Sequence, residues 1–310
     1  MSLSLFLGTL FNALYQASLL ALVTLAITLI FKTSFTTNFA QGSIGTFTSF
    51  FATIFNLNVL SKVFPNMDSI MLIILAMTSG FIIGFMIGLF IDIILIRKAK
   101  FSNILTKQMI TMGMVLVLTG LVATLYKDYL TPAPSVPAFF NTQQAFRFMV
   151  DGKEVSFLYQ RILTIGISIT IIGIIFALLK FTKWGLGVRA TASNEKVASM
   201  MGVNTRFITA MSWGIASAIG SIAAFLYAVD QTLNTGLMVF MQVNGFLAGV
   251  MGGFATFFGP VVGAILIPVA NAFAQRYFGI WSMVFIYVLV LVVVLIRPTG
   301  LFGKKVAKKV

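Results

Sequence analysis

The stretch Gly185–Asn204, GLGVRATASNEKVASMMGVN, is a polar interruption in a chain that is otherwise mostly apolar. Long hydrophobic runs lie on both sides of it, at Tyr159–Leu179 and Phe207–Val229. Apolar runs of about 20 residues are long enough to cross a bilayer as helices. The polar stretch is therefore interpreted as a loop that joins two membrane spans.

The same loop contains the signals of a short helix. Ser193 is predicted to accept a backbone hydrogen bond as N-cap, and Glu195 falls in the first turn, where the helix dipole favours an anion. Gly202 stands where a left-handed residue would end the helix. The predicted helix has a small apolar face made of Val197, Ala198, Met200 and Met201. Two interpretations remain open: an ordinary, partly helical loop, or a helix that docks into a groove on a partner, for which adaptable methionines are suited.

Composition places the whole chain in the membrane. The 310 residues are 59% hydrophobic and 9% charged, with a mean hydropathy of +1.03. Soluble domains carry about 25% charged residues. The apolar runs are continuous rather than alternating, which disfavours a β-barrel. We expect an all-α polytopic membrane protein, one transmembrane domain over residues 1–310, with about eight to nine transmembrane segments, broken or re-entrant helices among them, in two related halves.

The residue types exclude several chemistries. The chain has no Cys and no His, so thiol chemistry, disulfides and His-based metal, proton-relay or catalytic sites are excluded. It has no Gly-x-x-x-x-Gly-Lys-Ser/Thr phosphate loop, and we expect it to bind no cofactor itself. No paired carboxylates fall inside the apolar runs, which disfavours an intramembrane enzyme or an ion-coupled carrier.

The first glycine-rich segment is Asn38–Phe55, NFAQGSIGTFTSFFATIF. One interpretation is a loop that leads into a small-residue packing helix. The other is a broken or re-entrant segment that lines a transport path, where irregular backbone is tolerated because it faces a cavity. The candidate pathway residues here are Asn38, Gln41, Gly42 and Ser43.

A second glycine-rich region, Leu237–Ala272, lies after the polar loop. Its glycines and prolines are expected to interrupt any single helix and to give two short spans with a turn near Gly252 and Gly253. Glycine- or proline-interrupted apolar segments in corresponding places of two halves point to a transport pathway. The candidate pathway residues here are Asn244, Gly252, Gly253 and Gly259.

The span Ile70–Ile96 carries two further signals. Gly80, Gly84 and Gly88 recur every four residues, and such a small-residue stripe predicts close packing against a neighbouring helix. Asp92 follows near the end of the span, and we expect its carboxylate to pair with the basic cluster at Arg97 and Lys98.

The basic residues predict an orientation. With the central loop, about 181–206, in the cytoplasm and the N-terminus outside, 15 of the 21 lysines and arginines lie inside, as the positive-inside rule requires. The net charge of +14 is then explained by orientation, without a nucleic-acid partner. The outer loop, about 127–156, includes an Asp-Gly turn at Asp151 that indicates a small hairpin. The cytoplasmic residues are Lys32, Arg97, Lys98, Lys100, Lys107, Lys180, Lys183, Arg189, Lys196, Arg206, Arg297, Lys304, Lys305, Lys308 and Lys309.

Four motifs carry a family resemblance. They are the loop with Gly185, Gly187, Arg189, Ala190, Glu195, Ala198, Met200, Met201, Gly202 and Asn204; the NFAQG element; the Gly-Gly followed by Gly-Pro; and the RPTGLFG ending at 297–303. Together they resemble the permeases of branched-chain amino acid ABC transporters, the LivH/LivM type. The resemblance covers most of the chain.

The resemblance implies the permease subunit of an ABC importer that moves branched-chain or other amino acids. It implies separate ATPase subunits that use ATP, a second homologous permease or a second copy, a substrate-binding protein outside, and membrane lipid around the spans. It assigns ATPase coupling to Arg189, Glu195, Ala198, Met200, Met201 and Gly202. Gln41 stands where His is frequent in the family, and the outer loop is long, which puts the substrate in doubt. The alternatives are an ABC permease for a sugar, nucleoside, urea or amide, a stand-alone facilitator or channel for small solutes, and a scaffold without a pathway.

Overall fold

The computed structural model describes residues 2–99, 103–141 and 143–303 and shows a helical protein. Two compact units form. One comprises residues Met1–Thr28, Phe140–Thr170 and Val243–Val310, and the other comprises Leu29–Phe139 and Ile171–Gln242. Each unit draws on sequence before and after the central loop, so neither coincides with one predicted half. The predicted basic positions at Lys100 and 304–309 lie outside the described residues.

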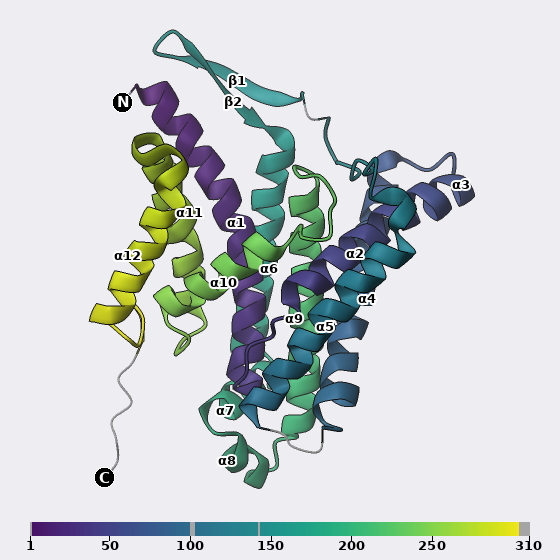
Figure 1. Cartoon of the computed structure of the whole chain (residues 1–310), viewed down its shortest axis with the longest axis vertical. Helices are drawn as coiled ribbons and strands as arrows, with labels where there is room; N and C mark the ends of the chain where they lie inside the picture. Colours follow the sequence, from purple (N-terminus) through teal and green to yellow (C-terminus); the bar gives the residue numbers. More distant parts are fainter. Residues whose placement is uncertain (1, 100–102, 142, 304–310) are drawn as a thin grey trace. The chain divides into compact units, whose positions relative to one another are not determined.

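The helices follow the predicted spans closely (Figure 1). The α-helices are α1 Leu3–Ser34, α2 Gln41–Phe55, α3 Ser61–Val63, α4 Ser69–Phe90, α5 Ile104–Leu125, α6 Tyr159–Phe181, α7 Lys183–Ser193, α8 Glu195–Met200, α9 Thr205–Ala228, α10 Val239–Gly252, α11 Phe258–Phe278 and α12 Ser282–Ile296. Two π-helical stretches, η1 Asn56–Leu60 and η2 Ile91–Ile96, extend α2 and α4. Single 3₁₀ turns lie at η3 Lys127–Tyr129 and η4 Gly279–Trp281, and the strands are β1 Ala145–Val150 and β2 Lys153–Leu158.

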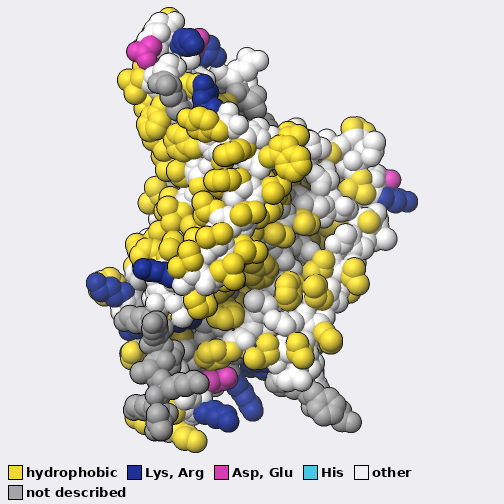
Figure 2. Space-filling view, turned by 60° about the vertical axis from the view of Figure 1, so that its left-hand side comes forward, with side chains coloured by type: hydrophobic (Ala, Val, Ile, Leu, Met, Phe, Trp, Pro, Cys, Tyr) yellow, Lys and Arg dark blue, Asp and Glu magenta, His cyan; other side chains and the backbone are white. Residues whose placement is uncertain are grey.

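Seven helical stretches among the described residues are long and apolar enough to cross a membrane. One of them, Phe258–Ile296, contains both α11 and α12, and the shorter apolar helix α10 comes in addition. Hydrophobic side chains dominate the face drawn in Figure 2, where charged side chains are few. The predicted class, a helical polytopic membrane protein with interrupted segments, is confirmed.

One predicted boundary is wrong. The first glycine-rich segment was expected to span Asn38–Phe55, but the helix that begins at Gln41 continues through η1 to Val63. The glycine- and proline-rich region Leu237–Ala272 is interrupted as expected, between the end of α10 at Gly252 and the start of α11 at Phe258, and α11 itself then runs unbroken through Pro268. Pro260 lies in the first turn, where its missing N–H has no intrahelical partner to lose.

Helix α9 forms the core of the second unit. Most of its residues are buried, and α4 and α2 pack along it. The predicted glycine stripe of α4 makes this contact possible. A Cβ at Gly84 would overlap Ser221, and one at Gly88 would overlap the backbone carbonyl of Trp213. The prediction that this stripe serves helix packing is confirmed.

The first unit contains the predicted hairpin, which is longer than its Asp-Gly turn indicated. Strands β1 and β2 pair antiparallel from Ala145 opposite Leu158 to Val150 opposite Lys153. Both turn residues, Asp151 and Gly152, have positive φ, as a tight two-residue hairpin turn requires. The hairpin lies beside the start of α1 (Figure 1), where the rings of Phe11 and Phe157 stack with centroids 4.3 Å apart.

We expect Gly88→Ala to destabilise the protein by about 1–3 kcal/mol, because the added methyl group would overlap the backbone of α9. Gly120→Ala is the matched control: Gly120 also lies in a span, on α5, and a Cβ there meets nothing within 4 Å. The measurement is thermal unfolding in detergent. Equal melting temperatures for the two variants would contradict the close packing of α4 on α9.

Candidate functional site

The chain between α1 and α2 is a break held by buried polar side chains. Asn38 donates from Nδ2 to Oε1 of Gln41 at 3.1 Å, and its Oδ1 accepts from the N–H of Ala40 at 3.0 Å. Gln41 donates from Nε2 to the carbonyl of Ala216 on α9 at 2.9 Å. Asn38 and Gln41 are fully buried. Their amides therefore fix the break to α9.

A second glutamine clamps the same break from α10. Gln242 accepts from the N–H of Gly42 and donates from Nε2 to the carbonyl of Phe39. The N–H of Phe39 donates in turn to Oγ1 of Thr111 on α5 at 3.3 Å. A Cβ at Gly42 would lie 2.5 Å from Oε1 of Gln242, so a larger residue there would displace this amide from its hydrogen bond. The predicted site residues Asn38, Gln41 and Gly42 are thus brought together in one network.

In the first unit, a second break separates α10 from α11, and the RPTGLFG ending closes it. The N–H groups of Leu301 and Phe302 donate to the carbonyls of Met251 and Gly252 at 2.9 and 3.1 Å, and so cap the end of α10. Gly253 has φ +89° and lies against the backbone of Thr299 and Gly300. Two motifs that are distant in sequence therefore form one cluster, and the predicted turn near Gly253 is confirmed.

The other predicted pathway residues lie at or near one of the two breaks. Gly252 and Gly259 touch backbone to backbone across the second break. Asn244 is buried on α10. Ser43 is half-buried in the first turn of α2. The structure thus forms two groups, one around each break, and the two groups belong to different compact units.

The central loop is largely helical, because α7 precedes the predicted short helix α8 (Figure 1). The predicted cap at Ser193 is wrong. Ser193 ends α7, and Asn194 caps α8 by accepting from the N–H of Val197 at 3.1 Å. The predicted end is confirmed: Gly202 has φ +84° and its N–H donates to the carbonyl of Ser199 at 3.1 Å.

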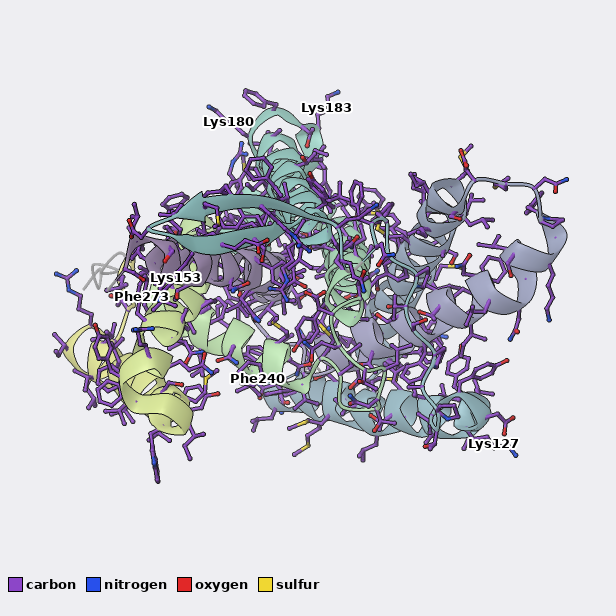
Figure 3. All side chains as sticks on the ribbon, turned by 90° about the horizontal axis from the view of Figure 1, so that it is seen from above. Lys127, Lys153, Lys180, Lys183, Phe240 and Phe273 are labelled. Carbon is purple, nitrogen blue, oxygen red and sulfur yellow. The ribbon has the colours of Figure 1, made fainter. Side chains whose placement is uncertain are left out.

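Helix α8 buries one residue and exposes its large apolar ones. Ala198 is 5% exposed, whereas Met200 and Met201 are 84% and 80% exposed. Glu195 in the first turn and Arg189 on α7 are also exposed. Exposed methionines beside charged residues are typical of an adaptable docking surface. Lys180 and Lys183, at the junction of α6 and α7, project outward nearby in sequence (Figure 3).

A charged cavity of about 380 Å³ lies beside α8. It brings together residues from the end of α1, from η2, from the starts of α5 and α9, and from α8. The lining residues are Thr33, Ser34, Asp92, Ile96, Arg97, Lys107, Glu195, Arg206 and Thr209. All belong to the second unit.

Arg97 is the structural centre of this cavity. Its guanidinium pairs with the carboxylate of Asp92 and donates to the backbone carbonyl of Arg206 and, at 3.3 Å, to Oγ1 of Thr209. The predicted pairing of Asp92 with the basic cluster is confirmed, through Arg97. The contact ties η2 to the first turn of α9, which directly follows α8. Sequence reasoning missed the cation's second role, since Arg206 is distant along the chain.

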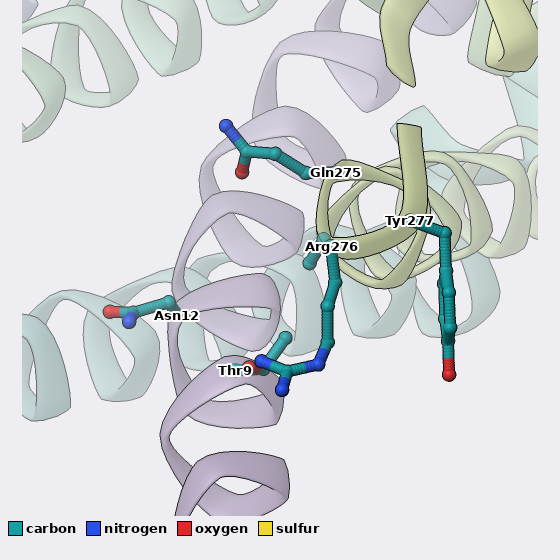
Figure 4. A pocket seen from close by; sticks show the side chains of 6 residues that line it. Thr9, Asn12, Gln275, Arg276 and Tyr277 are labelled. Carbon is teal, nitrogen blue, oxygen red and sulfur yellow. The ribbon is translucent and has the colours of Figure 1, made fainter. Parts of the chain in front are cut away.

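A larger, open pocket of about 630 Å³ lies in the first unit between α1 and α11 (Figure 4). It is lined by Thr9, Asn12, Ala272, Gln275, Arg276 and Tyr277. Arg276 extends toward Thr9, whereas Asn12 points away from it (Figure 4). Oδ1 of Asn12 accepts from Arg161 on α6. The polar groups do not converge on one point, so this pocket is not taken as the functional site.

Interrupted apolar helices joined by an exposed loop helix define a polytopic membrane protein. The family model described as "Branched-chain amino acid transport system / permease component" matches residues 9–294. The chain belongs to this family, and its predicted family resemblance is confirmed.

Curated relatives match along nearly the whole chain. BraD, a high-affinity branched-chain amino acid transport system permease protein of Pseudomonas aeruginosa, is 26% identical over 98% of both chains. LivH of Escherichia coli is 24% identical, also over 98% of both. A probable LivH of Methanocaldococcus jannaschii is 26% identical over 94% of this chain and 91% of its own. A solved structure, PsaBC from Streptococcus pneumoniae in complex with Fab, is 14% identical over 94% of this chain and 92% of its own, with a TM-score of 0.47, and adds no argument.

We expect Gln41→Ala to lower stability by about 1–3 kcal/mol, because it leaves the carbonyl of Ala216 and the amide of Asn38 buried without this partner. Gln144→Ala, at an exposed position, serves as control. Thermal unfolding of both variants in detergent is the measurement. A Gln41→Ala protein as stable as the control would show that the amide network does not hold the break.

Gly300→Ala is expected to disrupt the cap of α10. Gly300 has φ +80°, and a Cβ would overlap the backbone of Gly253. Gly279→Ala is a matched control, since Gly279 also has positive φ, +52°, but has nothing within 4 Å of its Cβ position. Gly300→Ala should therefore lower the free energy of unfolding by about 1–3 kcal/mol more than Gly279→Ala does. Equal losses would mean that only backbone strain matters.

Proposed function

We propose that this chain is a permease subunit of an ABC importer that carries branched-chain or chemically similar amino acids into the cell. The family match over residues 9–294 carries the proposal. Relatives named for high-affinity branched-chain amino acid transport, aligned over 98% of the chain, support the substrate class. The chain would bind no cofactor itself, and its ATPase partners would use the ATP.

The proposed docking element for an ATPase subunit is α8. Its N-cap at Asn194 and its left-handed end at Gly202 hold a single short helix in place. Ala198 anchors it, while Met200 and Met201 remain free to enter a partner groove. Arg97 links the start of α9 to η2. A movement of α8 would therefore be transmitted to the span formed by α9 and to the span that ends in η2.

The proposed orientation places α8 in the cytoplasm and the N-terminus outside. Within the second unit, Ser34, Arg97, Lys107 and Glu195 line one cavity, as expected if their loops lie on one side of the membrane. In the same unit, Asn58 donates from Nδ2 to the hydroxyl of Tyr129, which lies in the outer loop, so the end of the helix that follows α2 is expected on the outer side. The excess of basic residues then decides which side is cytoplasmic.

The proposed pathway uses the first break. Backbone groups freed from helical pairing are tolerated inside a membrane protein where they line a cavity or find polar partners. In the present conformation, side-chain amides satisfy the first break. We therefore place the substrate path beside Asn38, Gln41 and Gly42 and expect the path to open only when the spans move.

The direct test is reconstitution. The full chain would be purified in mild detergent with the proteins that accompany it, placed in vesicles with a binding protein outside, and assayed for ATP-driven leucine uptake. Co-purification of an ATPase and ATP-dependent uptake would support the proposal. A chain that purifies alone and passes small solutes without ATP would support the stand-alone facilitator instead.

A charge on the exposed face of α8 tests the docking assignment. Met200→Glu should reduce ATPase co-purification by about tenfold or more, because it places an unpaired charge in the proposed interface. The variant is expected to insert into the membrane and to keep the thermal stability of the unmodified chain, since Met200 is 84% exposed.

Met149→Glu is the matched control. Met149 is similarly exposed, at 73%, but lies on β1 in the outer hairpin. It should retain the ATPase at the level of the unmodified chain. Docking on α8 would be contradicted if both variants lost the ATPase to the same extent, or if both retained it.

A further inference from the structure

The charged cavity beside α8 is lined by several charged side chains, and not all of them take part in an ion pair within the described residues. Arg97 and Asp92 pair with each other. Within the described ranges, no ion pair joins Lys107, Arg206 or Glu195 to an opposite charge, although all three line the same cavity. Lys107 donates a hydrogen bond to the backbone carbonyl of Ser34, at 3.4 Å. Two cations and one carboxylate thus remain available to a ligand.

The mixture of charges restricts which ligand fits. A phosphate or other simple anion would face the carboxylates of Glu195 and Asp92, and a metal cation would face three basic side chains. A molecule with a carboxylate and an ammonium group finds a partner for each. The cavity volume of about 380 Å³ falls within the range of small-molecule sites. Ile96 adds an apolar wall.

We propose that this cavity binds a free zwitterionic amino acid. Its carboxylate would lie against Lys107 and Arg206, its ammonium group against Glu195, and its side chain toward Ile96. The site is separate from the amide network at Asn38 and Gln41, which contributes no lining residue.

Occupation of this site has a structural consequence. Lys107 belongs to the first turn of α5, Arg206 to the first turn of α9, and Glu195 to α8. A bound amino acid therefore joins α8 to two spans and restrains it. In the importer proposed above, this would let the amino acid on the cytoplasmic side slow its own uptake. Only this last consequence rests on the proposed function, and the binding is measured without transport.

The test is equilibrium dialysis of labelled L-leucine against the purified full chain in lipid nanodiscs, without ATPase or binding protein. We expect saturable binding of one leucine per chain. Lys107→Gln and Glu195→Gln should each weaken it by about tenfold or more, because each removes a hydrogen bond to a charged group. Lys107→Arg and Glu195→Asp should largely retain it. Lys62→Gln, exposed and outside the cavity, is the control.

Two analogues test the need for both charges. Leucinamide lacks the carboxylate and 4-methylpentanoate lacks the ammonium group, so both should bind about tenfold or more weakly. Three outcomes would overturn the proposal: no saturable leucine binding, binding unchanged in both Lys107→Gln and Glu195→Gln, or either analogue or inorganic phosphate binding as well as leucine. ATP-driven uptake by the unmodified chain is assayed separately, so failure of this site and failure of the importer proposal are distinguishable.

Discussion

The structure depends on satisfying backbone polar groups wherever a helix is interrupted in an apolar environment. A free N–H or carbonyl there has no water to bind and costs several kcal/mol if it is left without a partner. The break before α2 meets this constraint with the side chains of Asn38, Gln41, Gln242 and Thr111. The break after α10 meets it with backbone N–H groups from the chain's RPTGLFG ending. The same constraint is solved once with side chains and once with backbone.

The two solutions differ in what they permit. Side-chain amides can exchange partners, because an amide offers both donors and an acceptor and can rotate. We therefore propose that the break held by Gln41 and Gln242 is the one that opens and closes, with these amides exchanging partners. Backbone capping of α10, with glycines packed against glycines, leaves no such freedom. We accordingly place the moving part of the pathway at the first break and regard the second as a rigid support.

Glycine has a second role in the membrane interior. Without a hydrophobic effect to drive helix association there, close packing supplies much of the attraction, and small residues permit it. Gly84 and Gly88 bring α4 onto α9, and Gly45 brings α2 onto the same helix. Helix α9 follows α8 directly, and Arg97 fastens the first turn of α9 to η2, which extends α4. We therefore propose that a displacement of α8 is transmitted to α9, α4 and α2 through these close backbone contacts.

Hydropathy and turn chemistry alone determined the spans, the glycine stripe, the end of α8 at Gly202 and the hairpin turn at Asp151, because these features depend on neighbouring residues. Local signals also misled at two points: Asn194 rather than Ser193 caps α8, and α2 continues past Phe55 as a π-helix. The candidate residues Asn38, Gln41 and Gly42 were found by sequence, but not their partners. Gln41 binds Ala216 and Gln242 binds Phe39 across 175 and 203 residues. The charged cavity likewise joins loops that are far apart in the chain. Only the tertiary structure decided these contacts, because the residues near a buried amide in the sequence do not determine which distant backbone group it will contact.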